Sequence, residues 1–260
     1  MKNNRFYISF VIFILSICAI PHSLMSQNKK QTITTDYHQN SYWFGFTLGM
    51  KINSLSMNYI DDYQTKQFLL SDKEKTDILH LSQFDIQYNH DIYYTIEDMR
   101  LPINIGYTIG DVFNLRLYKD FHLRLIPSMN FSKQKIDYTI KIFNELYRFQ
   151  ESIELCCIEL PILVKYEFHK ANNRAAFILA GTNYKLNLSN QKNINTIITK
   201  SNIFATEIGA GVDFYTPKFR LGIELKMSYG LNNIIKEKNF STNHIDKLRD
   251  RSFQISFYFE

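Results

Sequence analysis

The sequence predicts an all-β protein, an eight-stranded antiparallel up-and-down transmembrane β-barrel. Two features indicate this fold, namely an N-terminal segment typical of export signals and C-terminal strands with alternating character. From Phe219 to Tyr229 every second residue is large and apolar, and the residues between them are small or charged. Because successive side chains of a strand point to opposite faces, such strands place apolar side chains toward lipid and polar ones in the lumen.

The N-terminus predicts a signal peptide over residues 1–26. Lys2 and Arg5 precede an apolar run from Phe6 to Ile20, which is short for a spanning helix of about 20 residues. Small residues near Ser26 provide a cleavage site. The segment therefore predicts export across the inner membrane.

The remainder divides into a lead-in over residues 27–42, without apolar periodicity, and a barrel domain over residues 43–260. No later stretch has eighteen consecutive apolar residues. Without Lys2 and Arg5 the net charge falls from +5 to +3. This charge is too small to indicate nucleic acid or an acidic substrate as a partner.

Alternation predicts the first four strands over residues 43–57, 102–117, 121–140 and 151–168. In the first, the large apolar residues from Phe44 to Ile52 alternate with glycine, threonine and lysine. The other three carry aliphatic and aromatic residues on one face and mainly polar or charged residues on the other. Each therefore has one face suited to lipid.

The last four strands are predicted over residues 174–188, 203–215, 219–231 and 251–260. The first of these is rich in alanine and glycine, and its facing remains open. The second alternates isoleucine, alanine, valine and phenylalanine with glutamate, glycine and aspartate. The final strand alternates phenylalanine and isoleucine with serine, glutamine and tyrosine.

Two strands contain irregularities that predict β-bulges. The apolar phase of the second strand slips near Asp111, and Pro161 lacks the N–H that a sheet ladder requires. Pro161 also follows the adjacent Cys156 and Cys157, whose side chains should point to opposite faces. We therefore expect two reduced, packed thiols rather than a disulfide.

The connections alternate in length. Short turns are predicted at 118–120, 169–173 and 216–218, and longer connections at 58–101, 141–150, 189–202 and 232–250. Outer-membrane barrels combine short periplasmic turns with longer external loops. An even strand number then places the N-terminus in the periplasm and lets the last strand pair with the first, leaving no open edge.

The connection 58–101 is too long for a structureless loop. Apolar residues within it predict that part of it extends strands beyond the membrane or folds over the barrel mouth. These residues are Leu79, Leu81, Phe84, Ile86 and Tyr88.

Charged residues on the inward faces form the candidate site, a lumen charge network. Its members are Arg124, Glu159, Lys165, Glu167, Glu207, Asp213, Arg220, Glu224 and Lys226. An eight-stranded barrel has an interior just wide enough for side chains to fill, and opposite charges there can pair. A structural filling of the lumen is the favoured interpretation. The alternative, a proton, ion or peptide path, requires a wider or opening lumen.

The sequence predicts no enzyme, no catalytic residue, no metal site and no cofactor. The histidines of the barrel domain lack metal-ligand spacing, and neither a nucleophile elbow nor a phosphate-binding glycine loop occurs. These histidines are His80, His90, His122, His169 and His244.

Several blocks resemble the PorT (SprT) family of outer-membrane proteins. They include Phe44–Gly49, Phe121–Pro127, Glu159–Tyr166, Glu207–Tyr215 and Gly222–Asn233, and they are spread across about residues 43–260. The resemblance implies an outer-membrane component required for type IX protein secretion, and possibly for gliding motility. It implies other secretion components as partners, beside the lipid, and supplies no catalytic residues. The alternative function is a small channel or ligand-binding barrel.

Overall fold

The computed structural model describes most of the predicted barrel domain. The described residues are 41–61, 65–70, 91–100, 102–143, 145–171, 173–188, 199–216, 218–236 and 242–260. The predicted signal peptide and nearly all of the predicted lead-in therefore lie outside them. Within the described part of the chain, no helix is long and apolar enough to cross a membrane.

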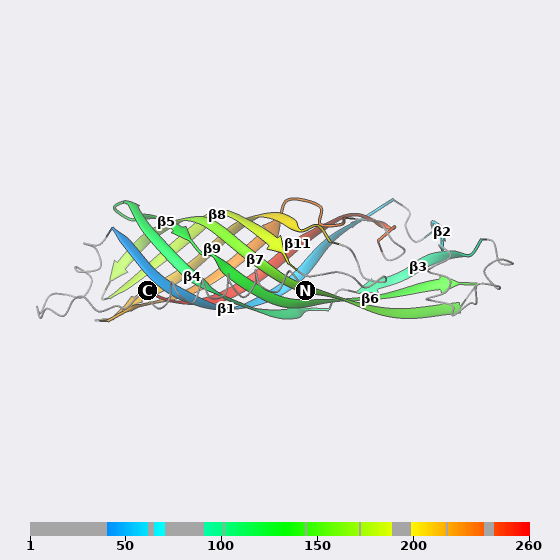
Figure 1. Ribbon diagram of the computed structural model, residues 1–260, viewed down its shortest axis with the longest axis horizontal. Helices are drawn as coiled ribbons and strands as arrows, with labels where there is room; N and C mark the ends of the chain where they lie inside the picture. Colours follow the sequence, from blue (N-terminus) through cyan, green and yellow to red (C-terminus); the bar gives the residue numbers. More distant parts are fainter. Residues whose placement is uncertain are drawn as a thin grey trace, which may run out of the picture.

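The main body is a closed antiparallel barrel (Figure 1). Its strands are β1 (Tyr42–Tyr59), β4 (Asn104–Tyr118), β5 (Phe121–Leu125), β6 (Ser128–Ile142), β7 (Glu145–Ala171), β8 (Arg174–Asn187), β9 (Asn202–Tyr215), β10 (Arg220–Gly230) and β11 (Ile245–Phe259). Strand β1 pairs with β11 on one side and with β4 on the other, which closes the barrel. Closure satisfies the backbone groups that an open edge would expose to hydrocarbon.

Strands β5 and β6 act as one barrel strand, so the barrel has the predicted eight. Phe113 of β4 pairs with Leu125, and Gly110 pairs with Ser128, so one register runs through both segments. The interruption at Pro127 reflects the missing proline N–H. The Pro127 carbonyl still accepts a hydrogen bond of 3.0 Å from the backbone N–H of Asp111.

Both predicted bulges are wrong. The register between β1 and β4 continues without a shift through Asp111, and the discontinuity lies across the ladder at Pro127. Strand β7 keeps its register with β8 through Pro161, and on its other side the register with β6 continues into β5; its register shift lies between Glu167 and Lys170. A proline removes one donor but adds no residue to the strand, so it breaks a hydrogen bond without forcing a bulge.

The predicted connection 141–150 is also wrong, because most of it is strand. Ile142 pairs with Glu145, so β6 and β7 continue beyond the barrel to a turn at Phe143. Phe143 adopts a positive φ of 49° in this turn.

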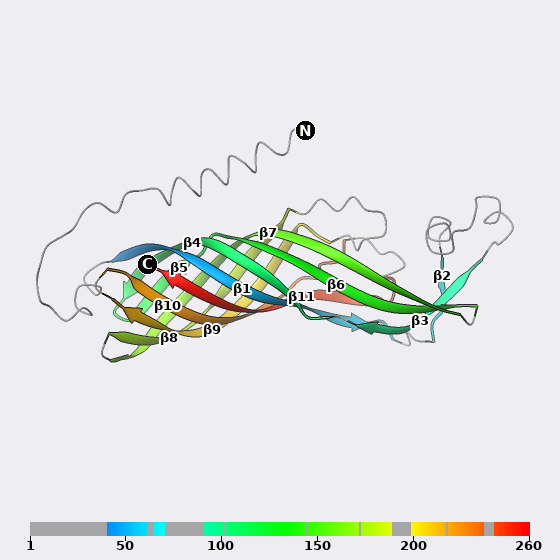
Figure 2. The ribbon, with the colours of Figure 1, turned by 90° about the horizontal axis from the view of Figure 1, so that it is seen from below.

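Two further strands join this projection, hereafter the extension. Strand β3 (Tyr93–Arg100) pairs with β6, and β2 (Phe68–Leu69) pairs with β3. Figure 2 shows β3 and the ends of β6 and β7 projecting past the other barrel strands. Part of 58–101 therefore extends the sheet, although the five apolar residues predicted to do so, Leu79 to Tyr88, lie outside the described residues.

The outer wall of the barrel is apolar. On β1 the side chains of Phe44, Phe46, Leu48, Met50 and Ile52 are exposed, whereas those of Thr47 and Lys51 between them are buried. The same alternation continues on β7, β10 and β11, as predicted. This pattern is the reverse of a soluble protein and matches a wall that faces lipid.

The interior of the extension is apolar, unlike the lumen below it. Its buried side chains come from β1, β2, β3, β6, β9 and β11 and from the connections between them. They include Leu55, Phe68, Leu70, Ile92, Tyr94, Ile96, Ile136, Tyr138, Ile140, Ile142, Ile203, Ile234, Ile235, Ile245 and Leu248. This cluster is a hydrophobic core of its own and covers the barrel at the end opposite the short turns.

Candidate functional site in the barrel lumen

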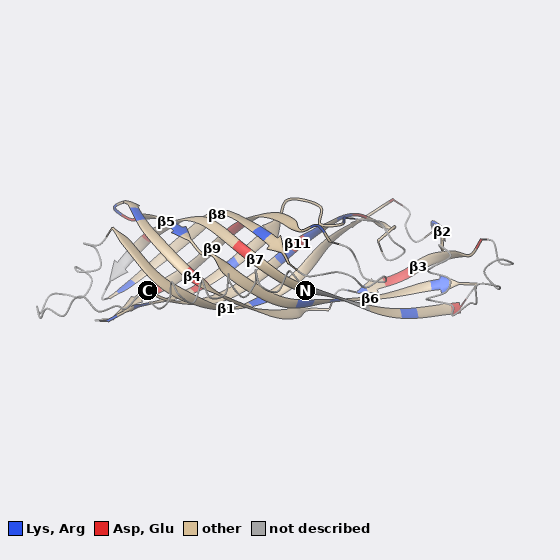
Figure 3. Ribbon diagram, viewed as in Figure 1, with Lys and Arg blue, Asp and Glu red and all other residues tan. Residues whose placement is uncertain are grey.

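All nine residues of the predicted charge network lie inside the barrel. The structure buries every one of these side chains to within 3 % exposure. Figure 3 shows basic and acidic positions distributed over the strands of the barrel. Buried charges are costly unless they are paired and hydrogen-bonded, so their partners decide what the lumen can do.

One network, the turn-side network, lies near the short turns and is centred on two arginines. Arg124 Nη1 lies 2.9 Å from Glu224 Oε2, and Arg124 Nη2 lies 2.6 Å from Glu260 Oε1. Arg220 forms a second ion pair with Glu260, whose carboxylate also accepts a hydrogen bond of 3.0 Å from Asn114 Nδ2. The carboxylate of Glu260 thereby joins β4, β5 and β10.

The same network continues around Lys165. Its ammonium pairs with Asp213 and lies 3.5 Å from Glu167 Oε1. Arg220 Nη1 lies 3.7 Å from Glu167 Oε1, and His122 Nε2 lies 3.4 Å from the same oxygen. Acidic and basic groups therefore alternate through the turn-side network, which compensates charge in a buried space.

A second network, the extension-side network, lies nearer the extension. Lys51 Nζ lies 2.6 Å from Glu159 Oε1, and Lys226 Nζ lies 2.9 Å from Glu207 Oε2. The amide of Asn183 donates to both carboxylates, at 3.2 Å to Glu159 and 2.7 Å to Glu207. This amide links the two ion pairs into a single unit.

An apolar layer separates the two networks along β7 and β9, whereas on β10 Glu224 and Lys226 are successive inward residues. The members of the layer are Val112, Ile126, Leu163, Phe177, Leu179 and Tyr258. Along β7 the inward residues run from Glu159 through Leu163 to Lys165, so an apolar side chain separates the networks on that strand. Among the described residues, the turn-side and extension-side networks accordingly share no ion-paired residue.

The apolar layer is packed against the turn-side charges. Lys165 Nζ lies 4.0 Å from the centroid of the Phe177 ring, and the Arg124 guanidinium lies 3.9 Å from that of Tyr258. Gly211 provides the space for Phe177, since a Cβ at that position would clash with Phe177 Cζ. Cation–π contacts of this kind stabilise a buried cation beside an apolar surface.

Several members of the networks were not predicted. Lys51 lies at an inward position of β1, and Glu260 follows β11 in the same phase as its inward residues, so alternation alone could have found both. Lys185 lies on β8, whose facing the sequence left open, and pairs at 2.6 Å with Asp250. Asp250 had been assigned to a connection, whereas β11 already begins at Ile245.

The histidines and cysteines lie in separate parts of the described structure. Within it, no group of three or more His, Cys, Asp and Glu residues could hold a metal ion. His122 contacts Glu167 in the lumen, and His244 stacks on Tyr59 near the extension. Cys157 is buried and Cys156 is half-buried, and neither forms a disulfide within the described structure. His80 and His90 lie outside the described residues, and the side chain of His169 is not among those described.

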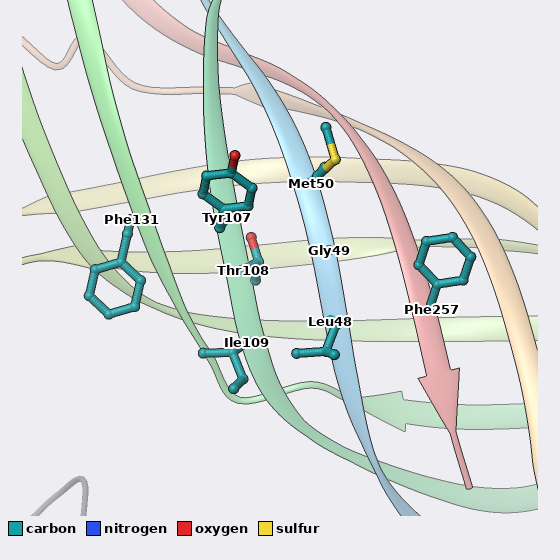
Figure 4. A pocket seen from close by; sticks show the side chains of 8 residues that line it. All are labelled: Leu48, Gly49, Met50, Tyr107, Thr108, Ile109, Phe131 and Phe257. Carbon is teal, nitrogen blue, oxygen red and sulfur yellow. The ribbon is translucent and has the colours of Figure 1, made fainter.

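The outer wall carries two shallow depressions. One, of about 280 Å³, lies between exposed side chains of β1, β4, β6 and β11, as Figure 4 shows. It is lined by Leu48, Gly49, Met50, Tyr107, Thr108, Ile109, Phe131 and Phe257. The other, of about 550 Å³, lies on β7 to β11 where Ala180 and Ala210 leave space between larger side chains. Both open toward the apolar wall, so they suit acyl chains.

The comparison with known protein families identifies an outer-membrane barrel domain. A family model described as outer membrane protein beta-barrel domain matches residues 25–236. No curated protein matches the chain. Solved structures similar to it include Neisserial surface protein A, with a TM-score of 0.40 and 8 % identity over 84 % of this chain and 98 % of that one. They also include OprG from Pseudomonas aeruginosa, with a TM-score of 0.36 and 10 % identity over 83 % of this chain and 93 % of that one.

Proposed function

The chain belongs to the outer membrane protein β-barrel family, and we propose that it is a closed, non-enzymatic barrel that supports type IX secretion by holding or assembling partner proteins. The closed barrel rests on one observation, the lumen in which two ion-pair networks and an apolar layer lie in series. The secretion assignment is supported by the resemblance of residues 43–260 to the PorT (SprT) family.

The filled lumen argues for a structural role because opening it is costly. For water to pass through the lumen, the side chains of the apolar layer would have to move apart. At least one ion pair in each network would also have to break. Breaking a buried ion pair costs about 3–5 kcal/mol when one partner is left uncompensated. The charge network is therefore proposed to be structural, holding the strands together where an eight-stranded barrel has little free interior.

Partner contacts are proposed to lie on the extension and the lead-in, because lipid occupies the outer wall. The extension carries exposed large apolar side chains at its tip. These are Leu69, Tyr93, Phe143 and Leu146. Exposed apolar side chains beyond a membrane wall are typical of a protein-binding surface.

The proposed orientation places the N-terminus and the short turns in the periplasm and the extension outside the cell. It is supported by the short turns at residues 119–120 and at Asn173, which lie at the end opposite the extension. Outer-membrane barrels show this asymmetry between short periplasmic turns and longer external segments.

The alternative function is a small channel or ligand-binding barrel. The observation that supports it is the charged lining of the lumen. Planar-bilayer recording separates the two functions. We expect no steady, ion-selective conductance from the native barrel. A Leu163→Ala/Phe177→Ala variant, which thins the apolar layer, should conduct more than its control, Val164→Ala/Ile178→Ala, which changes adjacent residues on the outer wall. A steady native pore would instead support the channel.

A gene deletion tests the secretion assignment. We expect a clean deletion strain to lose secretion of type IX cargo, and the native gene to restore it. A Phe143→Glu/Leu146→Glu variant should assemble but restore secretion poorly if the tip of the extension binds a partner. An Arg100→Glu variant, exposed on β3, is the control. Normal secretion by the deletion strain would exclude the assignment and leave the barrel without this role.

A further inference from the structure

We propose that Tyr229, Lys247, Arg249 and Arg251 form a binding site for the phosphate groups of lipopolysaccharide in the outer leaflet. The three basic residues occupy successive outward positions of β11. They directly precede Phe253, Ile255 and Phe257, which face lipid on the same strand. The site therefore lies at the rim where the apolar wall ends on the extension side.

Tyr229 holds the two arginines on one surface. Arg249 Nη1 donates a hydrogen bond of 3.0 Å to the hydroxyl of Tyr229. Arg251 pairs with Tyr229 in the ladder between β10 and β11, and its guanidinium lies 4.9 Å from the ring centroid. Side chains that are already ordered lose less freedom when they bind a ligand.

The arginines lack an acidic partner among the residues that the structure describes. Asp250, between them in sequence, points into the barrel and pairs with Lys185 at 2.6 Å. The ladder partners of Arg249 and Arg251 on β1 are Ser56 and Ser54, which carry hydroxyls instead of carboxylates. The buried Nε of Arg249 also has no hydrogen-bond partner there. The site thus offers donors and positive charge, the combination that binds an oxyanion.

Lys247 widens the site toward solvent. Its side chain is 52 % exposed, and its contact with Asp246 is long, with Nζ and Oδ2 3.9 Å apart. An exposed ion pair at this distance contributes little to stability, so Lys247 can exchange Asp246 for a phosphate at low cost. Two arginines and a lysine along one strand suit a lipid that carries more than one phosphate.

The position of the site indicates which phosphate-bearing lipid can reach it. Lipid phosphates lie at the boundary of the hydrocarbon, where barrels carry their aromatic girdles. Under the proposed orientation this rim faces the outer leaflet, so the phosphorylated lipid there is lipopolysaccharide. The inference uses that orientation but does not depend on a role in secretion.

Binding of purified lipid A to the barrel in detergent tests the site. We expect Arg249→Gln/Arg251→Gln to weaken binding of bisphosphorylated lipid A by about tenfold to a hundredfold, as the loss of two charge-assisted contacts predicts. Dephosphorylated lipid A should bind the native barrel and this variant equally. Lys119→Gln/Arg174→Gln, at the opposite end of the barrel, should bind like the native protein. Heat-modified gel mobility verifies that each variant is folded.

Three outcomes would overturn the proposal. The first is equal binding of lipid A by the native barrel and the arginine variant. The second is displacement of lipid A by inorganic phosphate at equal concentration, which would indicate a general anion site. The third is tighter binding of phosphatidylglycerol, an inner-leaflet lipid. A preference for phosphatidylglycerol could also arise if the barrel were inverted in the membrane. Labelling of an Asn243→Cys variant on intact cells tests this, because it reports whether the rim faces the cell exterior.

Discussion

Arg124 and Glu260 form an ion pair of 2.6 Å inside the barrel although 136 positions separate them in the chain. Glu260 also pairs with Arg220, so a single carboxylate compensates two buried guanidinium groups. The pair ties β5 across the lumen to the residue that follows β11. It therefore connects the part of the barrel formed early in the chain with the strand that closes it.

Removing this carboxylate should destabilise the barrel strongly. Glu260→Leu leaves Arg124 and Arg220 each short of a partner, and we expect a loss of about 3–5 kcal/mol in the free energy of unfolding. Urea titration of the barrel in lipid vesicles measures it. Asp98→Leu is the control, since the Asp98–Arg100 pair is exposed and should contribute less than about 1 kcal/mol. A similar cost for both variants would contradict a structural role for the lumen network.

The facing of β10 predicts effects of different size on assembly for two adjacent residues. Ile223 is exposed on the outer wall, whereas Glu224 is fully buried and accepts hydrogen bonds from Arg124 and Tyr258. Ile223→Arg should cost about 2–4 kcal/mol if the site lies near the bilayer midplane, because it places a charge in lipid. Glu224→Gln keeps the shape and should be milder for insertion. Heat-modified gel mobility of outer-membrane fractions measures assembly, and equal tolerance of both changes would contradict the assigned facing.

The apolar layer predicts a similar contrast on β8. Phe177 is fully buried in the lumen, and the next residue, Ile178, is about half exposed on the outer wall. Phe177→Ala should lower the free energy of unfolding by about 3–5 kcal/mol, as cavity formation does in packed cores. Ile178→Ala should cost less, because lipid chains fill the space that it leaves. Unfolding titrations measure both losses. A larger loss for Ile178→Ala than for Phe177→Ala would refute the apolar layer.

Much of this architecture follows from local pattern, because lipid imposes a period of two on each spanning strand. The pattern located all eight barrel strands and placed residues such as Lys165 and Glu207 in the lumen. It could not orient β8, where Phe177 and Leu179 are apolar residues that face inward. It also took Lys141 to Gln150 for a loop, because the hairpin turn at Phe143 lacks the usual glycine signal. Ion-pair partners such as Arg124 and Glu260 meet only when the barrel closes, so their pairing cannot be predicted from a local sequence pattern.

The burial of His244 predicts a pH dependence of stability. His244 lies in the connection before β11, and burial lowers its pKa from 6.5 to about 4. The unfolded chain therefore binds a proton between these values and the folded one does not, so stability falls as the pH decreases from 6.5 to 4. We expect a loss of at most about 3 kcal/mol from this residue. Urea midpoints between pH 4 and 7 should decline less in His244→Gln, and an unchanged slope would contradict the assignment.

The arrangement of the connections predicts which residues are accessible from outside the cell. A cysteine at Asn243, in the connection before β11, should react with an impermeant thiol reagent on intact cells. A cysteine at Lys218, in the short turn before β10, or at Lys119, in the turn after β4, should react only after the outer membrane is opened. The reason is that short turns of outer-membrane barrels lie in the periplasm. Cys156 and Cys157 are replaced by serine in all three strains, which removes background labelling. The reverse pattern would invert the orientation and place the extension in the periplasm, while the closed barrel would remain as described.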